Sequence, residues 1–425
     1  MTHHSPDAAA QPENTAGSLR NAAIFSTGGI IVQGVSRLVF TIGVGRAFGS
    51  ETLGETSALM SLAIFAALFW PTPAGNTASR LLALALHRGD SDRAVLRLLG
   101  RTFWLSCLVL GVAAVPVGIA LGAELVPSLF GAWLVVGYAG YAYARSAQLG
   151  RHRATRVALW DAVSSFATLA ALLGVIVAGV PAVALLPMAL GYTVFAIALW
   201  PRARREGAEQ TTDGLLAFAG WNVIAGLASN GLLQIMMLAA QVYNPGHEAG
   251  LFATAFSLAT PASMLGQAAS QVIIPAFAHR TRSDAPLRSS AAMKLLFGFS
   301  GLALVAFGAL ALLAPWIVPL LYGQDFVDAV PLLQLMLIGV FVFTVALIPS
   351  ALLLANGHSR AVALSSSVGF VVGLVVILVL GPGIGMYAGI VGFTVGSGIG
   401  LVALLVLGLR RSPVEAPLEG LDPLA

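Results

Sequence analysis

Apolar stretches long enough to cross a lipid bilayer recur along nearly the whole chain, and only short polar connections separate them. About 20 apolar residues in a helix span the roughly 30 Å of hydrocarbon in a bilayer. The composition agrees, since 58% of the residues are hydrophobic and 9% are charged, against about 25% charged residues in soluble domains. We therefore expect an all-α polytopic membrane protein, without a soluble segment large enough for a catalytic or nucleotide-binding domain.

Polar breaks between the apolar stretches predict about twelve transmembrane helices. Helices are expected because lipid offers no hydrogen-bond partner to the backbone, so each span must satisfy its own N–H and C=O groups. The predicted spans cover residues 21–47, 54–84, 102–121, 128–149, 157–179, 182–200, 214–242, 250–278, 291–313, 330–355, 361–380 and 386–408.

The arginines outside these spans indicate the orientation of the chain. They lie in the even-numbered connections or near the ends, whereas the odd-numbered connections carry acids. Cytoplasmic loops are enriched in Lys and Arg, so the even connections and both termini are expected in the cytoplasm. An Arg-rich, Lys-poor chain also suggests a bacterium with a GC-rich genome, and hence its cytoplasmic membrane. The arginines are Arg20, Arg88, Arg93, Arg97, Arg101, Arg151, Arg153, Arg156, Arg202, Arg204, Arg205, Arg280, Arg282, Arg288, Arg360, Arg410 and Arg411.

An internal duplication is visible as three short matches in the same order. LGETSALMSL (53–62) pairs with AGLFATAFSL (249–258), VPSLFG (126–131) with VPLLYG (318–323), and LGYTVF (190–195) with VGFTVG (391–396). A six-span unit and its copy enter the membrane in the same orientation, which predicts two parallel-repeat six-helix bundles around a central cavity. The expected divisions are a disordered cytoplasmic tail (1–19), an N-terminal bundle (20–205), a cytoplasmic linker (206–213), a C-terminal bundle (214–408) and a cytoplasmic tail (409–425).

A polar stripe on the first span contains a deeply placed arginine. Gln33, Arg37 and Thr41 are spaced four residues apart, so they lie above one another on one helix face. A lone arginine at this depth costs about 2.5–3.5 kcal/mol on insertion scales, which favours a watery cavity or a partner over lipid. A fixed guanidinium suits an anion such as phosphate or pyrophosphate. A structural ion pair or snorkelling to the interface is the alternative.

Further polar residues are candidates for the wall of the same cavity. Gln33 and Arg37, together with Arg145 near the end of span 4, form the candidate site for an anionic headgroup. Amides and hydroxyls can bind sugar hydroxyls, yet in membranes they also hold helices together, so packing is the alternative role for each. The cavity-lining polar candidates are Thr41, Asn76, Asn230, Gln234 and Gln267.

Asp161 is the acid most nearly embedded in a span. It can pair with an arginine, couple transport to a proton or cation, or interact with the positive N-terminal end of its own helix. The sequence contains no HExxH metal pattern and no GxxxxGK[ST] phosphate loop, and Cys107 is its only cysteine. We therefore expect no enzymatic activity, no catalytic residues, no metal and no cofactor.

Six segments carry a family resemblance through their order along the chain: GRAFGSETLGETSAL, PTPAGNTASRLLA, AGLFATAFSLATPASMLGQAASQVIIPAFAHR, LLYGQDFVDAVPLLQLM, LLLANGHSRAVA and GPGIGMYAGIVGFTVG. Together they resemble the bacterial polysaccharide and O-antigen flippases of the multidrug, oligosaccharidyl-lipid and polysaccharide exporter superfamily. Ser36-Arg37 and the turn Arg46-Ala47-Phe48-Gly49 are similar to a pattern in the first helix of the related lipid II flippases. That match implies that Arg37 helps to bind pyrophosphate.

The resemblance implies a V-shaped pair of bundles that moves a polyprenyl-(pyro)phosphate-linked oligosaccharide from the inner to the outer leaflet by alternating access, for cell-surface polysaccharide assembly. The expected partners are this lipid-linked glycan, membrane lipids, and a polysaccharide polymerase or glycosyltransferases. No nucleic acid is expected, and a monomer is the family expectation.

A cation-coupled multidrug exporter of the multidrug and toxin extrusion type is the alternative function. That branch has the same fold but commonly uses a membrane acid for coupling, whereas the first span here carries an arginine. The lipid II flippases usually have two further spans and a more charged cavity, so a peptidoglycan precursor is not the first expected cargo.

Overall fold

The computed structural model describes residues 12–203, 207–208, 212, 214–261, 287, 289–356 and 358–410, with side chains from residue 27 onward. This part of the chain is helical and contains no β-strand. The first half consists of α1 (Pro12–Ala67), α2 (Pro71–Arg88), α3 (Arg93–Ala120), α4 (Leu125–Gly150), α5 (Ala154–Ala178) and α6 (Leu186–Leu199). The second half consists of α7 (Leu215–Gly226), the π-helical turn η2 (Leu227–Gly231), α8 (Leu232–Tyr243), a helix described over 247–261, α10 (Ser290–Tyr322), α11 (Ala329–Ala355), α12 (Ser359–Ile384) and α13 (Tyr387–Leu409).

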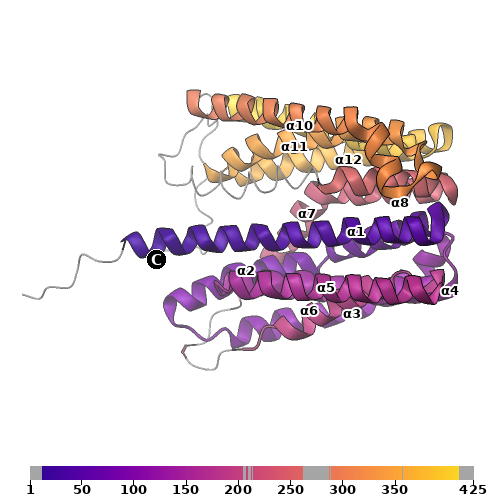
Figure 1. The fold of residues 1–425 in the computed structure, drawn as a ribbon. Helices are drawn as coiled ribbons and strands as arrows, with labels where there is room; N and C mark the ends of the chain where they lie inside the picture. The colour runs from indigo at the N-terminus through magenta and orange to yellow at the C-terminus, as the bar shows by residue number, and fades with distance from the viewer. Residues whose placement is uncertain are drawn as a thin grey trace, which may run out of the picture.

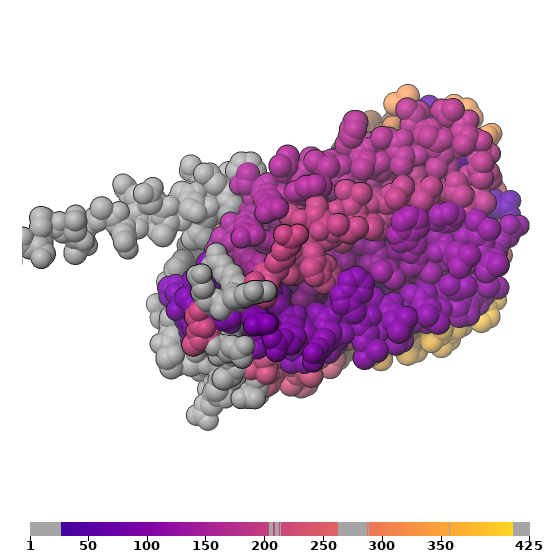
Figure 2. Space-filling view, turned by 90° about the horizontal axis from the view of Figure 1, so that it is seen from below, coloured from indigo at the N-terminus to yellow at the C-terminus, as the bar shows by residue number. Residues whose placement is uncertain are grey.

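The helices form two bundles that lie side by side, with most helix axes running in nearly the same direction (Figure 1). One bundle contains α1 to α6 and the other contains α7 to α13. α1 lies at the junction, since it packs against α4 and α5 of its own bundle and against α8 and α10 of the other. Figure 2 shows a face of the molecule that is covered mainly by the first half of the chain. The polar stripe of α1 is thus positioned between the bundles.

Ten helices in the described part of the chain are long and apolar enough to cross a bilayer. Many of their large apolar side chains point outward. Leu108 and Val112 on α3, and Leu312 and Trp316 on α10, are all more than half exposed. Lipid tails accept such side chains, and the helices satisfy their own backbone groups. The chain is therefore a multi-pass α-helical membrane protein, which confirms the predicted all-α class.

The described residues contain ten candidate membrane spans, whereas the sequence predicted twelve. The difference arises at the second and eighth predicted spans. α1 continues through the first predicted connection with a break at Gly49, where a φ of 84° is readily adopted by glycine. The predicted span 54–84 is interrupted at residues 68–70, and α2 begins at Pro71, since proline favours the first turn of a helix. The predicted span 250–278 extends beyond the described residues after position 261.

The repeated segments of the duplication meet at the junction of the bundles. Gly54 and Gly250 occupy matching positions in LGETSALMSL and AGLFATAFSL. A Cβ atom on Gly54 would lie 2.8 Å from the backbone nitrogen of Gly250, and one on Gly250 would overlap the carbonyl oxygen of Ser50. Because two equivalent residues of the repeat touch each other, the pseudo-twofold axis passes close to these two glycines.

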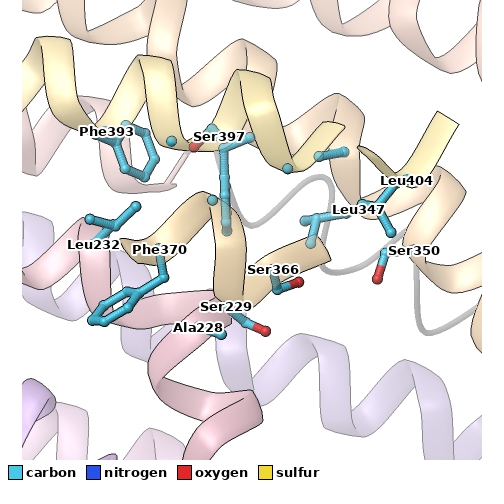
Figure 3. Close-up of a pocket in the computed structure, with 15 residues that line it drawn as sticks. Ala228, Ser229, Leu232, Leu347, Ser350, Ser366, Phe370, Phe393, Ser397 and Leu404 are labelled. Carbon is cyan, nitrogen blue, oxygen red and sulfur yellow. The ribbon is translucent and has the colours of Figure 1, made fainter. Parts of the chain in front are cut away.

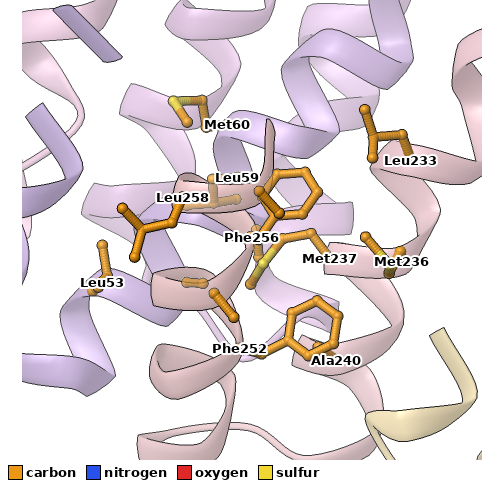
Figure 4. Packing of buried hydrophobic residues seen from close by; sticks show 14 of the residues in the cluster. Leu53, Leu59, Met60, Leu233, Met236, Met237, Ala240, Phe252, Phe256 and Leu258 are labelled. Atoms are coloured by element: carbon orange, nitrogen blue, oxygen red, sulfur yellow. The ribbon is translucent and has the colours of Figure 1, made fainter. Parts of the chain in front are cut away.

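A hydrophobic core also crosses this junction (Figure 4). Leu53 and Leu59 of α1 belong to the same buried cluster as Met236, Met237 and Phe252 of the second half. Between helices in lipid, close packing rather than removal from water supplies the attraction. The two methionines have flexible, unbranched side chains, so this contact can repack when one bundle shifts relative to the other.

Candidate functional site: the cavity between the bundles

A cavity of about 380 Å³ lies between the two bundles, against the polar stripe of α1. α1 lines it with residues on both sides of Gly49, while α4, α8 and the helix over 247–261 supply most of the remaining wall. The described lining residues include two arginines and no carboxylate. The polar ones are Gln33, Arg37, Thr41, Ser57, Ser61, Thr72, Tyr138, Tyr141, Arg145, Ser146, Asn230, Gln234, Ser257 and Thr260.

Arg37 lies on the cavity wall and is held by aromatic side chains. Its Nε donates a hydrogen bond of 2.6 Å to the hydroxyl of Tyr192 on α6. Its guanidinium carbon lies 5.4 Å from the ring centroid of Tyr138 and 5.6 Å from that of Tyr192. No carboxylate of the described residues pairs with it. The positive charge is thus stabilised by a phenol and two ring faces, without neutralisation by an acid.

Arg145 lies on the same wall, and its charge is balanced. Its Nε is 3.3 Å from Oδ2 of Asp161, whose side chain is fully buried. Tyr141 donates a hydrogen bond of 3.1 Å to the other carboxylate oxygen. Gln33 donates to the Ser164 hydroxyl at 2.9 Å and to the Asp161 carbonyl at 3.3 Å. The ion pair that the sequence left as one role for Asp161 is therefore present, and it leaves Arg37 as the uncompensated charge on the described wall.

The second bundle supplies amides to the opposite wall. Asn230 lies in the π-helical turn η2, and Gln234 follows one turn later in α8; both line the cavity. π-helical turns insert one extra residue into a helical turn and are frequent at functional sites. This turn changes which residues of the span face inward, an effect that a regular helical spacing does not anticipate.

Three buried polar atoms on the wall have no hydrogen-bond partner. They are the hydroxyls of Ser57 and Ser61 on α1 and the amide oxygen of Gln234. Buried polar groups are nearly always hydrogen-bonded, because leaving one unpaired costs about 1–3 kcal/mol. These atoms are therefore unsatisfied polar groups within the wall of the cavity.

The remaining predicted lining residues occupy different places. Thr41 lies on the wall, where its hydroxyl donates to the Leu38 carbonyl at 2.9 Å. Asn76 is absent from the described wall; it is exposed, and its amide oxygen accepts a hydrogen bond of 3.2 Å from the Ser146 hydroxyl. One isolated amide does not show which face of α2 points into the cavity, so the sequence could not locate Asn76 relative to the wall. Gln267 lies outside the described residues.

One end of the cavity is closed by polar contacts between the bundles. The hydroxyl of Tyr322, at the end of α10, lies 3.0 Å from the Thr41 hydroxyl and 2.6 Å from the Ser257 hydroxyl. Arg46 of α1 donates to the carbonyl of Leu321 at 2.7 Å, at the negative C-terminal end of α10. Arg46 is exposed, and its hydrogen bond joins the two bundles. This end carries the acidic, odd-numbered connections.

At the opposite end, α2 packs against α7. The guanidinium of Arg80 lies 4.8 Å from the ring centroid of Phe218. The bundles therefore touch at both ends of the cavity, and opening either end requires one of these two sets of contacts to separate.

A second, smaller pocket lies within the second bundle (Figure 3). Its volume is about 80 Å³, and its wall combines Phe343, Phe370 and Phe393 with serines such as Ser366 and Ser397. It contains no charged side chain, so it offers nothing to hold a phosphate group.

Tyr192 is the functional candidate that the sequence analysis missed. It is buried at 3% exposure and contacts Arg37 across 155 residues of chain. The segment LGYTVF, which contains it, stood out only as part of the duplication. Its repetition was the available signal, but the pairing with Arg37 depends on how α6 packs beside α1.

A family model for polysaccharide biosynthesis proteins matches residues 104–331, which is more than half of the chain. The chain belongs to this family. No curated protein sequence gives a significant match.

Solved structures of two transporter groups share the fold. A lipid II flippase, MurJ, in an inward closed conformation superposes with a TM-score of 0.71 at 14% identity, covering 90% of this chain and 87% of that one. An inward-facing multidrug resistance transporter of the MATE family gives 0.67 at 16% identity, covering 88% and 93%. The MATE multidrug transporter DinF-BH gives 0.66 at 14% identity, covering 96% and 98%.

These similarities confirm the predicted fold of two repeated bundles. At such low identity they establish the fold alone. Because lipid flippases and drug transporters share it, the cargo of this chain has to be argued from the cavity.

Proposed function

We propose that this protein flips a polyprenyl-(pyro)phosphate-linked oligosaccharide from the inner to the outer leaflet, for assembly of a cell-surface polysaccharide. Its membership of the polysaccharide biosynthesis family supports this proposal. The observation that carries it is Arg37, a cation on the cavity wall with no paired carboxylate among the described residues. An uncompensated positive charge in a membrane cavity attracts an anionic cargo and repels a cationic one.

In this proposal Arg37 binds the phosphate groups. A guanidinium can donate two parallel hydrogen bonds to phosphate oxygens, and such charge-assisted bonds are among the strongest in proteins. Gln33 and Arg145 hold the α1–α4–α5 wall around it through Asp161 and Ser164. This assigns the two residues a supporting position in the headgroup site.

The sugar part of the cargo would lie against the amides of the second bundle and the serine hydroxyls of α1 after Gly49. Asn230, Gln234, Ser57 and Ser61 offer donors and acceptors there, three of them with an unpartnered atom. Thr41 lies nearest the closed end, and Asn76 supports the wall through Ser146. The polyprenyl tail would remain in lipid, since only the polar headgroup needs a shielded path.

Transport would proceed by alternating access. The moving units are the bundles of residues 20–205 and 214–408, joined by the linker 206–213. The contacts at Tyr322 and at Arg80 lie at opposite ends of the cavity, so they can break in turn. A parallel-repeat transporter of this kind rocks its halves about a central site.

The proposed location is the bacterial cytoplasmic membrane, with both termini in the cytoplasm. The arginines of the even connections support this orientation through the positive-inside rule. We expect a monomer that receives its cargo from glycosyltransferases and delivers it to a polymerase.

A cation-coupled drug exporter is the second candidate, and the fold shared with MATE transporters favours it. Such a transporter would need an acid that exchanges a proton or metal cation. Asp161 is the buried acid beside the cavity, but it is engaged by Arg145 and Tyr141. Coupling through it would require Arg145 to leave, which makes this candidate the weaker one.

The deciding experiment is depletion of the protein in its native cells. Polyprenyl-linked glycan is extracted and identified by mass spectrometry, and its leaflet is determined with a membrane-impermeant glycosidase added outside. Accumulation on the cytoplasmic leaflet supports the flippase. An unchanged glycan pool combined with increased sensitivity to cationic drugs would support the exporter instead.

A further inference from the structure

A separate, arginine-lined pocket of about 320 Å³ lies where α4, α5 and α6 end or begin. It shares no lining residue with the central cavity. Four of its seven lining residues are arginines, and none of the seven is an acid. They are Arg151, Arg153, Arg156 and Arg202, with Gln148, Ala198 and Trp200.

The pocket is built by a tight turn tied to the end of α6. α4 ends at Gly150 and α5 begins at Ala154, and the turn between them places His152 at a positive φ of 56°. Gln148 donates to the Leu199 carbonyl at 2.8 Å, and Arg151 donates to the Arg202 carbonyl at 2.8 Å. These bonds fix the arginines around the pocket.

Arg151 gives this pocket the character of a binding site. Its side chain is 8% exposed and pairs with Asp92, yet its Nε is buried without a hydrogen-bond partner. Arg156 and Arg202 are exposed at the rim. The positive-inside rule accounts for arginines at this end of the molecule, but it does not call for a buried guanidinium with an unsatisfied donor on the wall of a pocket. The exposed side chains of Arg156 and Arg202 can reach an anion in the pocket, beside the positive charge of Arg151.

Aromatic side chains place the pocket at the level of lipid headgroups. The ring of Trp200 lies 5.3 Å from that of Trp104 and 5.4 Å from that of Tyr143. Along α3, the outward residues change from Arg97 and Arg101 to the exposed Trp104. Tryptophans concentrate at the boundary between water and hydrocarbon, so the pocket opens where phospholipid phosphates lie.

We propose that this pocket binds a phosphate group, carried by an anionic phospholipid of the adjacent leaflet. Arginine forks match phosphate oxygens in pairs, and basic pockets between transmembrane helices on the cytoplasmic side bind lipid headgroups. Free inorganic phosphate has the same binding chemistry. The apolar face of Trp200 favours the lipid, because it can also contact the first part of an acyl chain. The site is separate from the cargo path and does not depend on the identity of the glycan.

The test uses the purified full chain in detergent and native mass spectrometry. Phosphatidylglycerol or phosphatidylcholine is titrated, and the bound lipid is counted for the wild type and for Arg156→Gln/Arg202→Gln, which keeps the buried Arg151–Asp92 pair. The matched control, Arg97→Gln/Arg101→Gln, removes two exposed charges of the same sign from α3, outside the pocket.

We expect phosphatidylglycerol to bind the wild type and the control, and the pocket variant to bind it at least about tenfold more weakly, since each lost charge-assisted bond is worth more than one decade. Equal binding by wild type and pocket variant, or equal binding of both lipids, would overturn the proposal. In a parallel arm, radiolabelled inorganic phosphate replaces the lipid. Pocket-dependent phosphate binding without phosphatidylglycerol binding would support the phosphate site and assign it to the free ion.

Discussion

Replacing Arg37 tests the central assignment most directly. In the flippase proposal, its guanidinium makes at least two charge-assisted hydrogen bonds to the cargo's phosphates. At about 1.5 kcal/mol each, their loss in Arg37→Ala removes about 3 kcal/mol of binding, which is about a hundredfold in affinity. Arg37→Lys keeps the charge but not the planar fork, so it should retain partial transport.

The fold should tolerate the same substitution. Arg37→Ala removes the donor to the Tyr192 hydroxyl and the contact with two rings, at a cost of about 1–2 kcal/mol. It also removes a cation whose insertion costs about 2.5–3.5 kcal/mol. The two effects oppose each other, so the amount of inserted protein and its Tm in detergent should change little.

The assay is leaflet-resolved glycan accumulation in cells that express only the variant, with protein levels matched by immunoblotting. Arg97→Gln is the control, because it removes an exposed arginine of α3 that does not line the cavity. Normal glycan export by Arg37→Ala at normal protein level would refute the anion-site reasoning. Loss of export by the control as well would mean that overall charge, rather than the cavity, is responsible.

Three further variants test the contacts around the cavity. Tyr322→Phe removes the hydroxyl that joins the bundles at the closed end, and each lost hydrogen bond contributes about 1 kcal/mol to closure. A thiol reagent added from that side should then label cysteines introduced on the cavity wall more strongly. Unchanged labelling would contradict this. Asp161→Asn leaves Arg145 without its carboxylate. It should lower the free energy of unfolding by about 3 kcal/mol, measured as a lower Tm, while export remains measurable. A stable variant without export would instead favour ion coupling. Gly250→Ala brings a methyl group onto the Ser50 carbonyl and should destabilise the bundle junction by about 1–3 kcal/mol, detectable as a lower Tm; an unchanged Tm would show that the junction can spread.

Much of the fold was predictable because lipid imposes simple rules on a sequence. Length and hydropathy identified most spans, and the order of short repeats predicted two bundles. The divisions of the second span were not predictable in the same way. Gly49 lay in the predicted connection after the first span, and Pro71 lay inside the predicted span 54–84. A hydropathy pattern does not reveal that the helix resumes directly after Gly49 or that residues 68–70 form a turn.

The candidate site was partly predictable for the same geometrical reason. Gln33, Arg37 and Thr41 share a face because a helix repeats every 3.6 residues, and all three lie on the cavity wall. Their partners could not be predicted, since Tyr192 and Asp161 come from other helices and their positions depend on packing. The π-helical turn η2 was also invisible, as its sequence LASNG fits an ordinary helix.

The charges on the described cavity wall favour an anionic cargo because no carboxylate there pairs with Arg37. Asp161 pairs with Arg145, which leaves Arg37 to a phenol and two ring faces. Those contacts hold a guanidinium in place by about 1–2 kcal/mol together. A phosphate can add its own charge-assisted bonds to the remaining N–H groups without displacing the phenol. A cation would first have to overcome the field of Arg37, so the charge of the described wall suits the anionic cargo that we propose.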